Sequence, residues 1–151
     1  MRPHPRLGTV EVRVFDAQTR ISSVAAIAAL TQSLVATIGS AFECGDVAPP
    51  APAVVLEENR RRAARDGLDA RLVDPTDGTE RTAAETLRAL AERCAPAADA
   101  LGCAEQLELV DAILDRGTGA EEQLRAHEET HDIHAVARWL AEESAPQSLL
   151  V

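Results

Sequence analysis

The sequence predicts an α+β fold that is mostly helical, with one N-terminal strand, a short hairpin and about five to six helices. Three observations support this class. Apolar and polar residues alternate near the N-terminus, apolar residues recur at helical spacing through the second half, and 46% of the 151 residues are hydrophobic. This content suffices for a buried core. The length favours one domain over residues 1–151.

The first expected element is a strand. Residues 9–16 read TVEVRVFD, in which three valines alternate with other side chains. A period of two predicts a strand with one apolar face. Pro3 and Pro5 predict an extended, non-helical lead-in, and Gly8 permits a tight turn between the two segments.

A long helix is expected next, starting from N-cap candidates in residues 19–23 and running to about Phe42. Residues 21–42 carry no charge, and this uncharged stretch is long enough to span a bilayer. However, the stretch contains several Ser, Thr and Gln residues, lacks flanking Trp or Tyr, and is soon followed by acidic residues. These features favour a buried helix of a soluble protein and no membrane partner.

The remaining elements follow from turn residues and periodicity. After a Pro-rich loop, VVLEENRRRAARDG predicts an amphipathic helix over Ala53–Asp66 with Gly67 as its C-cap. LDARLVDPTDGTERTA predicts two short strands around a Pro-Thr-Asp-Gly turn. Later helices are expected near residues 82–100, 103–115, 118–130 and 132–144, separated by Pro96 or Gly102, Gly117–Gly119 and Asp132.

Charge is distributed unevenly and excludes several functions. Residues 1–73 hold nine Arg and eight acids, whereas residues 74–151 hold six Arg and seventeen acids. An acidic half repels phosphate backbones, so we expect no nucleic-acid partner, and any anion site should lie in the first half. The chain has no lysine, which excludes a P-loop and Schiff-base chemistry.

The cysteines and the N-terminus indicate the compartment. Cys44, Cys94 and Cys103 are odd in number and fit no metal spacing, which predicts a reducing compartment without a disulfide framework. The first thirteen residues lack the apolar run of a signal peptide. We therefore expect a cytoplasmic protein.

Glu11 and Arg13 are the first candidate site. Two residues apart on a strand, they share the face opposite the valines. The carboxylate could hold Mg²⁺, and the guanidinium could bind phosphate oxygens with two hydrogen bonds. The alternative is an ion pair on a solvated sheet face, and the spacing alone favours this alternative.

Residues 127–131 match the HExxH pattern, in which His127 and His131 could share Zn²⁺ with Glu128 as a base. Thr130 and Asp132 resemble helix caps, which would break the helix at this point. The chain also lacks a following third-ligand motif. The pattern therefore favours an ordinary surface helix over a zinc hydrolase.

A third candidate lies on the helix expected over Ala53–Asp66. Asn59 is accompanied by arginines that could bind an anionic substrate, namely Arg60, Arg62 and Arg65. The alternative, which we favour, is that Glu57 and Glu58 pair with Arg61 and Arg62 one helical turn later.

Several segments taken in order resemble one known family. These are RPHPRLGTVEVRVFDAQT, the charge-free helix, ENRRRAARDGLDARLVD and GTGAEEQLRAHEETHDIHAVARWL. Together they cover nearly the whole chain and resemble the ATP-dependent carboxylate–amine ligases related to glutamate–cysteine ligase type 2. The resemblance implies a glutamine-synthetase-like α+β fold, in which active-site strands form a sheet and helices pack outside it.

The resemblance also implies an activity. Such ligases join a carboxylate, typically the γ-carboxyl of glutamate, to an amine such as cysteine. They split ATP to ADP and phosphate with Mg²⁺, and the carboxylate is phosphorylated first to an acyl phosphate. This chemistry needs charge neutralisation and positioning more than a protein nucleophile.

Site residues follow from the same resemblance. Glu11 matches the metal-binding glutamate, and Arg13 matches the catalytic arginine that contacts the transferred phosphoryl group of the nucleotide. Arg2 belongs to the RPHP lead-in beside the site. Asn59 and Arg65 match the ENR…R segment and are assigned to nucleotide binding. The HEETHD segment aligns with an ordinary helical connection, which further disfavours zinc.

The resemblance places the chain in the C-terminal part of the family, about its last two fifths. Other Mg²⁺-binding acids, other strands and much of the substrate pocket are then expected outside the chain. We therefore expect an incomplete domain that is inactive alone, whether a fragment, a split-gene subunit or a protein completed by an N-terminal chain or a homo-oligomer. The rival hypothesis is a non-enzymatic acidic helical interaction module, suggested by the acidic half and by unpaired strand edges.

Overall fold

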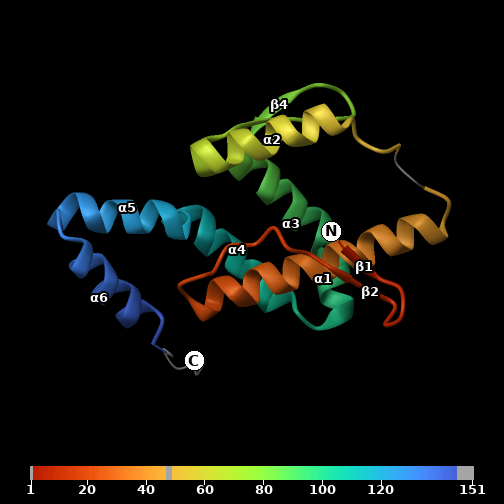
Figure 1. The fold of residues 1–151 in the computed structure, drawn as a ribbon. Coiled ribbons are helices and arrows are strands. Elements are labelled where there is room, and N and C mark those ends of the chain that lie inside the picture. The colour runs from red at the N-terminus through yellow and green to blue at the C-terminus, as the bar shows by residue number, and fades with distance from the viewer. Residues whose placement is uncertain (1, 47–48, 146–151) are drawn as a thin grey trace.

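A computed structural model describes residues 2–46 and 49–145. Helices dominate this part of the chain, and two small antiparallel hairpins complete it (Figure 1). The predicted α+β, mostly helical class is therefore confirmed. The helices are α1 (Ile21–Glu43), α2 (Ala53–Asp66), α3 (Ala83–Leu101), α4 (Ala104–Arg116), α5 (Gly119–Thr130) and α6 (Ile133–Glu143), with a short 3₁₀ turn, η1, at Gly67–Asp69.

The N-terminus forms a hairpin of β1 (Arg2–His4) and β2 (Thr9–Glu11), with Arg2 opposite Glu11. Gly8 adopts a positive φ of 63° in the turn, where its N–H donates to the His4 carbonyl. The predicted strand over residues 9–16 was too long. Its ladder ends at Glu11, opposite Arg2, and the lead-in expected only to be extended is itself a strand.

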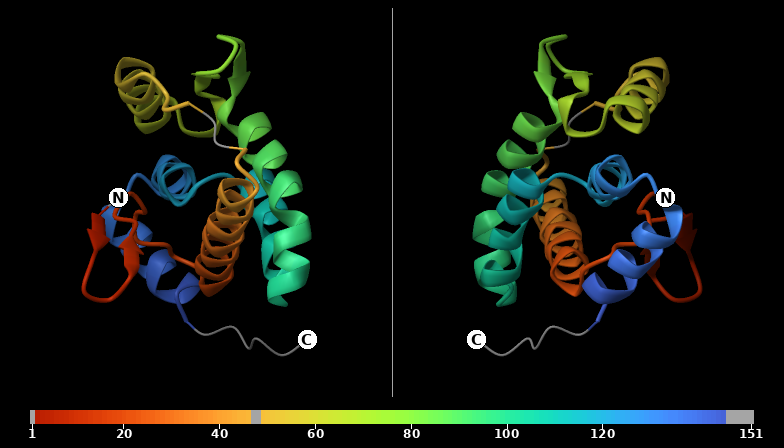
Figure 2. Two further views of the ribbon diagram at one scale, coloured as in Figure 1. Left: turned by 90° about the vertical axis from the view of Figure 1, so that its right-hand side faces the viewer. Right: turned by 90° about the vertical axis from the view of Figure 1, so that its left-hand side faces the viewer.

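Helix α1 packs through small side chains. Ala26, Ala29 and Ser33 are buried against α3 and α4, which lie beside α1 (Figure 2). Ser33 Oγ lies 3.6 Å from the Sγ of buried Cys103. The prediction of a helix ending near Phe42 is confirmed, but the expectation that it is buried is wrong for its opposite face, where Val24 and other apolar side chains are exposed.

Among the described residues, α1 is the one helix long and apolar enough to cross a bilayer, by length and composition only. A core helix can meet the same criterion. One face of α1 does pack within the protein, against α3 and α4.

The core lies between α1, α3 and α4. It consists of small and medium apolar side chains, namely Ala26, Ala29, Cys94, Ala98, Cys103, Leu107 and Val110. Helix α3 continues through Pro96 and ends at Gly102, whose left-handed φ of 69° turns the chain into α4. Of the two expected breaks, Gly102 is therefore the real one.

A second hairpin supports α2. Strands β3 (Arg71–Val73) and β4 (Glu80–Thr82) pair antiparallel and lead into α3, as the turn sequence predicts. The Asn59 side chain holds α2 to β3, since its amide donates to the Val73 carbonyl at 2.8 Å and accepts from the Val73 N–H at 2.9 Å. The predicted bounds of α2 and its end at Gly67 are confirmed.

Candidate functional site

Three of the predicted site residues lie on the N-terminal hairpin or just after it. Arg2 lies opposite Glu11 in the ladder, and paired residues of antiparallel strands point to the same face. Arg13 Nε lies 2.8 Å from Glu11 Oε1. These side chains are half or more exposed, 65% for Arg13 and 50% for Glu11. The hairpin thus presents one carboxylate and two guanidinium groups to solvent.

This group fits part of a metal–nucleotide site. Guanidinium groups bind phosphate oxygens, and a carboxylate is a Mg²⁺ ligand. Mg²⁺ requires octahedral coordination and is held by one or two carboxylates together with waters and phosphates. Within residues 2–46 and 49–145, no group of three or more His, Cys, Asp or Glu side chains could hold a metal ion. The hairpin can therefore supply one protein ligand.

Asn59 and Arg65, the other predicted site residues, lie on α2. In all views α2 is apart from the β1–β2 hairpin (Figures 1 and 2). Both side chains are engaged locally, Asn59 with Val73 and Arg65 with Asp66 at 2.6 Å. The structure therefore does not bring them together with Glu11, and their assignment to nucleotide binding stays a prediction.

The arginine-rich face of α2 is a network of ion pairs. Glu58 contacts both Arg61 and Arg62 at 2.8 Å. Hydrogen bonds from Arg61 and Arg62 lower the pKa of Glu58 to about 2. Arg62 also donates to Glu80 and to the Arg71 carbonyl, each at 2.9 Å, which joins α2 to the second hairpin. The predicted Glu58–Arg62 pair is confirmed.

Glu57 differs from its prediction. It pairs with Arg60 at 3.1 Å, three residues later, and not with Arg61. Arg61 is instead drawn to Glu58, where two of its nitrogens donate to the two carboxylate oxygens. Two parallel hydrogen bonds to one carboxylate are stronger than a single exposed contact, which explains the choice of partner.

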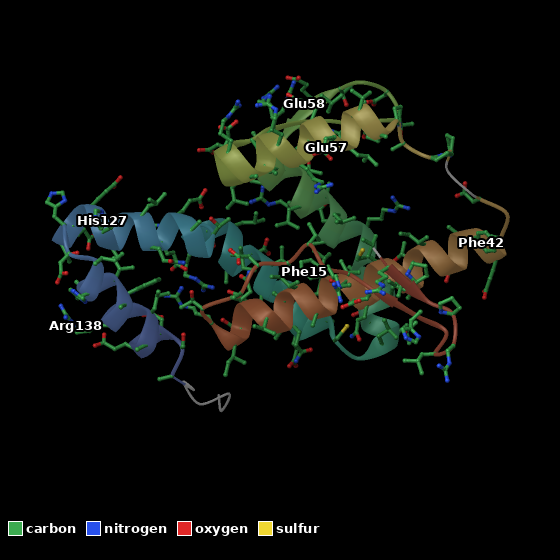
Figure 3. All side chains as sticks on the ribbon, viewed as in Figure 1. Phe15, Phe42, Glu57, Glu58, His127 and Arg138 are labelled. Carbon is green, nitrogen blue, oxygen red and sulfur yellow. The ribbon has the colours of Figure 1, made fainter. Side chains whose placement is uncertain are left out.

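The HExxH segment does not form a shared helical face. Helix α5 ends at Thr130, and His131 caps it with a left-handed φ of 50°. Asp132 then starts α6 by accepting a hydrogen bond from the His134 N–H. The rings of His127 and His131 are 6.3 Å apart, and His127 extends outward from α5 (Figure 3). The predicted helix break is confirmed, so His127 and His131 do not lie on one continuous helix, as the zinc motif requires.

Sequence reasoning missed the partly buried ion-pair cluster centred on Arg20. Arg20 sits just before α1 and contacts Glu122 of α5 at 2.6 Å and Glu143 of α6 at 2.7 Å. Its guanidinium also lies 5.8 Å from the centre of the Trp139 ring. Burial alone lowers the pKa of Arg20, but hydrogen bonds and charge from Glu122 and Glu143 outweigh this effect and raise it. No sequence signal links partners more than a hundred residues apart.

The part of the chain that the structure describes is thus a mostly helical α+β fold with an exposed carboxylate and guanidinium groups at its N-terminal hairpin. Comparison with known proteins identifies the family. The sequence matches Glutamate-cysteine ligase family 2 (GCS2) over residues 1–141. The chain belongs to this family, as the resemblance of its motifs predicted.

Individual relatives agree with this assignment. The chain is 41% identical over 129 residues to a Clavibacter sepedonicus protein, covering 85% of this chain and 34% of that protein. It is 38% identical over 144 residues to one from Mycolicibacterium vanbaalenii, covering 95% and 38%. Their names are "Putative glutamate--cysteine ligase 2" and "Putative glutamate--cysteine ligase 2-1". The chain thus spans about a third of the length of these curated relatives.

Proposed function

We propose that this chain contributes one side of the active site of an ATP-dependent carboxylate–amine ligase of the glutamate–cysteine ligase type. The observation that carries the proposal is the contact of Glu11 with Arg13, opposite Arg2, in a chain of this family. The proposed substrates are ATP, a glutamate-like carboxylate and an amine such as cysteine. The proposed location is the cytoplasm.

Glu11 is the proposed Mg²⁺ ligand on the hairpin. Its carboxylate is half exposed and its only ionic partner among the described residues is Arg13, so it can accept a metal without rearrangement of the core. Bound Mg²⁺ would neutralise charge on the phosphates of ATP.

Arg13 is the proposed contact of the transferred phosphoryl group. Its Nε is held by Glu11 at 2.8 Å, which orients the guanidinium while its side chain stays 65% exposed. The remaining N–H groups can donate to phosphate oxygens. Arg2, on the neighbouring strand, adds a second positive charge to the same end of the hairpin. Such positioning and charge stabilisation account for most of phosphoryl-transfer catalysis.

The site needs groups from a further polypeptide segment. Glu11 supplies a single carboxylate, and about two thirds of the length of the Clavibacter relative lies outside the match. We therefore propose that the 151-residue chain is inactive alone and gains activity when the missing ligands and substrate pocket are supplied.

Ligase activity tests this proposal. ADP release from Mg·ATP in the presence of glutamate and cysteine is measured for two samples. One is the chain alone, and the other is the chain co-expressed with the unmatched portion of the Clavibacter relative. We expect activity only in the combination, with a loss of about 100-fold or more in Glu11→Gln and Arg13→Ala. Arg138→Ala is the matched control, since Arg138 is 67% exposed on α6. Activity of the chain alone, or full activity of Glu11→Gln in the combination, would contradict the proposal.

The second candidate is a non-enzymatic interaction module, favoured by the exposed apolar side chains of α1. It predicts a chain that binds a protein partner without binding Mg·ATP. Calorimetry with Mg·ATP separates the two candidates, because only the ligase proposal expects binding that depends on Glu11.

A further inference from the structure

Helix α1 carries a second apolar face that the described residues leave largely open. We call this face the α1 stripe. Its members are spaced alternately three and four residues apart along the whole helix, namely Ile21, Val24, Ala28, Thr31, Val35, Ile38 and Phe42. Val24 is 50% exposed, Val35 62% and Phe42 70%. This spacing is that of a helix face that packs against another element.

The first half of the α1 stripe borders an apolar groove. The groove has a volume of about 470 Å³ and lies between α1 and the segment that follows β2. Val10, Val12 and Phe15 line it from the hairpin side, and Val24 and Ala28 line it from α1. Phe15 lies next to α1 (Figure 3) and is still 50% exposed.

The strand beside this groove is also incomplete. The alternating sequence of β2 continues through Phe15, but its ladder ends at Glu11. The sheet has only two strands, so each strand has one edge without a partner within the described residues. Isolated two-stranded hairpins are marginally stable, and open edges accept further strands.

We propose that the α1 stripe and the groove form the docking surface for the rest of a family ligase domain. That further polypeptide segment would add a strand beside β2 and cover the α1 stripe with apolar side chains. The inference rests on the proposed function, because it names the surface through which the Glu11–Arg13 site is completed.

Two observations select this occupant. The relatives carry about two thirds of their length outside the match, within the same polypeptides, so each has further polypeptide that is available to cover this surface. The surface itself is mostly apolar, since residues 21–42 carry no charge and Asp16 is the one charged residue among those that line the groove. Contiguous exposed apolar patches of this kind mark protein interfaces, and the lack of basic residues gives the stripe no attraction for anionic lipid headgroups.

Co-purification tests the docking surface. The tagged chain is co-expressed with the unmatched portion of the Clavibacter sepedonicus relative. We expect one-to-one recovery, reduced at least about tenfold by Val24→Asp, because docking would bury the new charge. An acidic residue near the N-terminus of α1 is compatible with the helix. The matched control is Val54→Asp, since Val54 is 75% exposed on α2, and its recovery should equal that of the wild type.

Other outcomes would overturn the inference. These are the absence of co-purification with the wild-type chain, and equal recovery with Val24→Asp. A homodimer of the chain alone that Val24→Asp makes monomeric would assign the surface to a second copy. Flotation with phosphatidylserine vesicles that depends on Val24 would assign it to a membrane. Glu11→Gln separates this inference from the proposed function, since it should keep co-purification and lose activity.

Discussion

At the residue scale, Arg20 shows how one side chain can hold distant helices together. It links the start of α1 to both α5 and α6, and its side chain is only 19% exposed. Glu122 is likewise 14% exposed. Two carboxylates that share one guanidinium in a partly buried place repel each other when the guanidinium is removed. The docking of α5 and α6 therefore depends on this residue.

We expect Arg20→Ala to lower the free energy of unfolding by about 3 kcal/mol, because it leaves enclosed carboxylates without a partner. Urea unfolding followed by circular dichroism measures this change. Arg138→Ala serves as the control, since its pair with Asp132 is 3.4 Å long and exposed, and such pairs contribute at most about 1 kcal/mol. Equal losses in the two variants would show that Arg20 has no special role.

Residue roles were only partly predictable from sequence. The Glu11–Arg13 contact follows from a spacing of two on an extended chain and is present at 2.8 Å. Asn59 illustrates the opposite case. Its amide is used by the Val73 backbone, a contact fourteen residues away that depends on how β3 packs against α2. Local spacing cannot predict such a contact.

At the element scale, the helices were predictable, whereas for the N-terminal strand the position was predictable and the length was not. Helix α2 has the predicted bounds because Pro52 precedes it and Gly67 ends it with a positive φ. The strand of residues 9–16 depends on a partner, and its ladder ends where β1 begins. Strand length is therefore a property of the sheet, whereas helix bounds are encoded locally.

The ion-pair network between α2 and the second hairpin predicts sensitivity to acid. The pKa of Glu58 is lowered to about 2, and hydrogen bonding to Arg62 also lowers the pKa of Glu80. A carboxylate whose pKa is lowered in the folded state stabilises the protein at pH values above its unfolded pKa of about 4.5. This stabilisation is lost as the pH falls toward 2. We expect Glu58→Gln to be less stable than the wild type at pH 6, with the difference shrinking as the pH falls from 4.5 toward 2.

Urea unfolding at several pH values measures this difference. Glu57→Gln is the matched control, because Glu57 lies on the same helix and pairs only with Arg60 on the exposed surface. A difference between wild type and Glu58→Gln that stays constant from pH 6 to pH 2 would contradict the assignment.

At the scale of the whole molecule, the chain combines a small packed core with surfaces that are left open. The core of α1, α3 and α4 is closed by small side chains, while the α1 stripe and the edges of β1 and β2 are not covered by described residues. The chain spans about a third of the length of its relatives. The packed core and the open surfaces are both explained if the rest of a complete domain buries the α1 stripe and the open strand edges. The family could be predicted from the order of the motifs along the sequence. The open face of α1 could not be predicted, because the apolar content of a helix does not reveal which of its faces is covered.

The proposed hairpin site is tested most simply by calorimetric titration of Mg·ATP into the folded 151-residue chain and into its variants Glu11→Ala and Arg13→Ala. We expect Mg·ATP to bind the wild-type chain and to bind each variant at least about tenfold more weakly, because each substitution removes a charged contact to the nucleotide or its metal. Arg138→Ala should bind as the wild type does. No binding to the folded wild-type chain, or binding to both hairpin variants that is as tight as to the wild type, would contradict the claim that the hairpin carries part of a ligase active site.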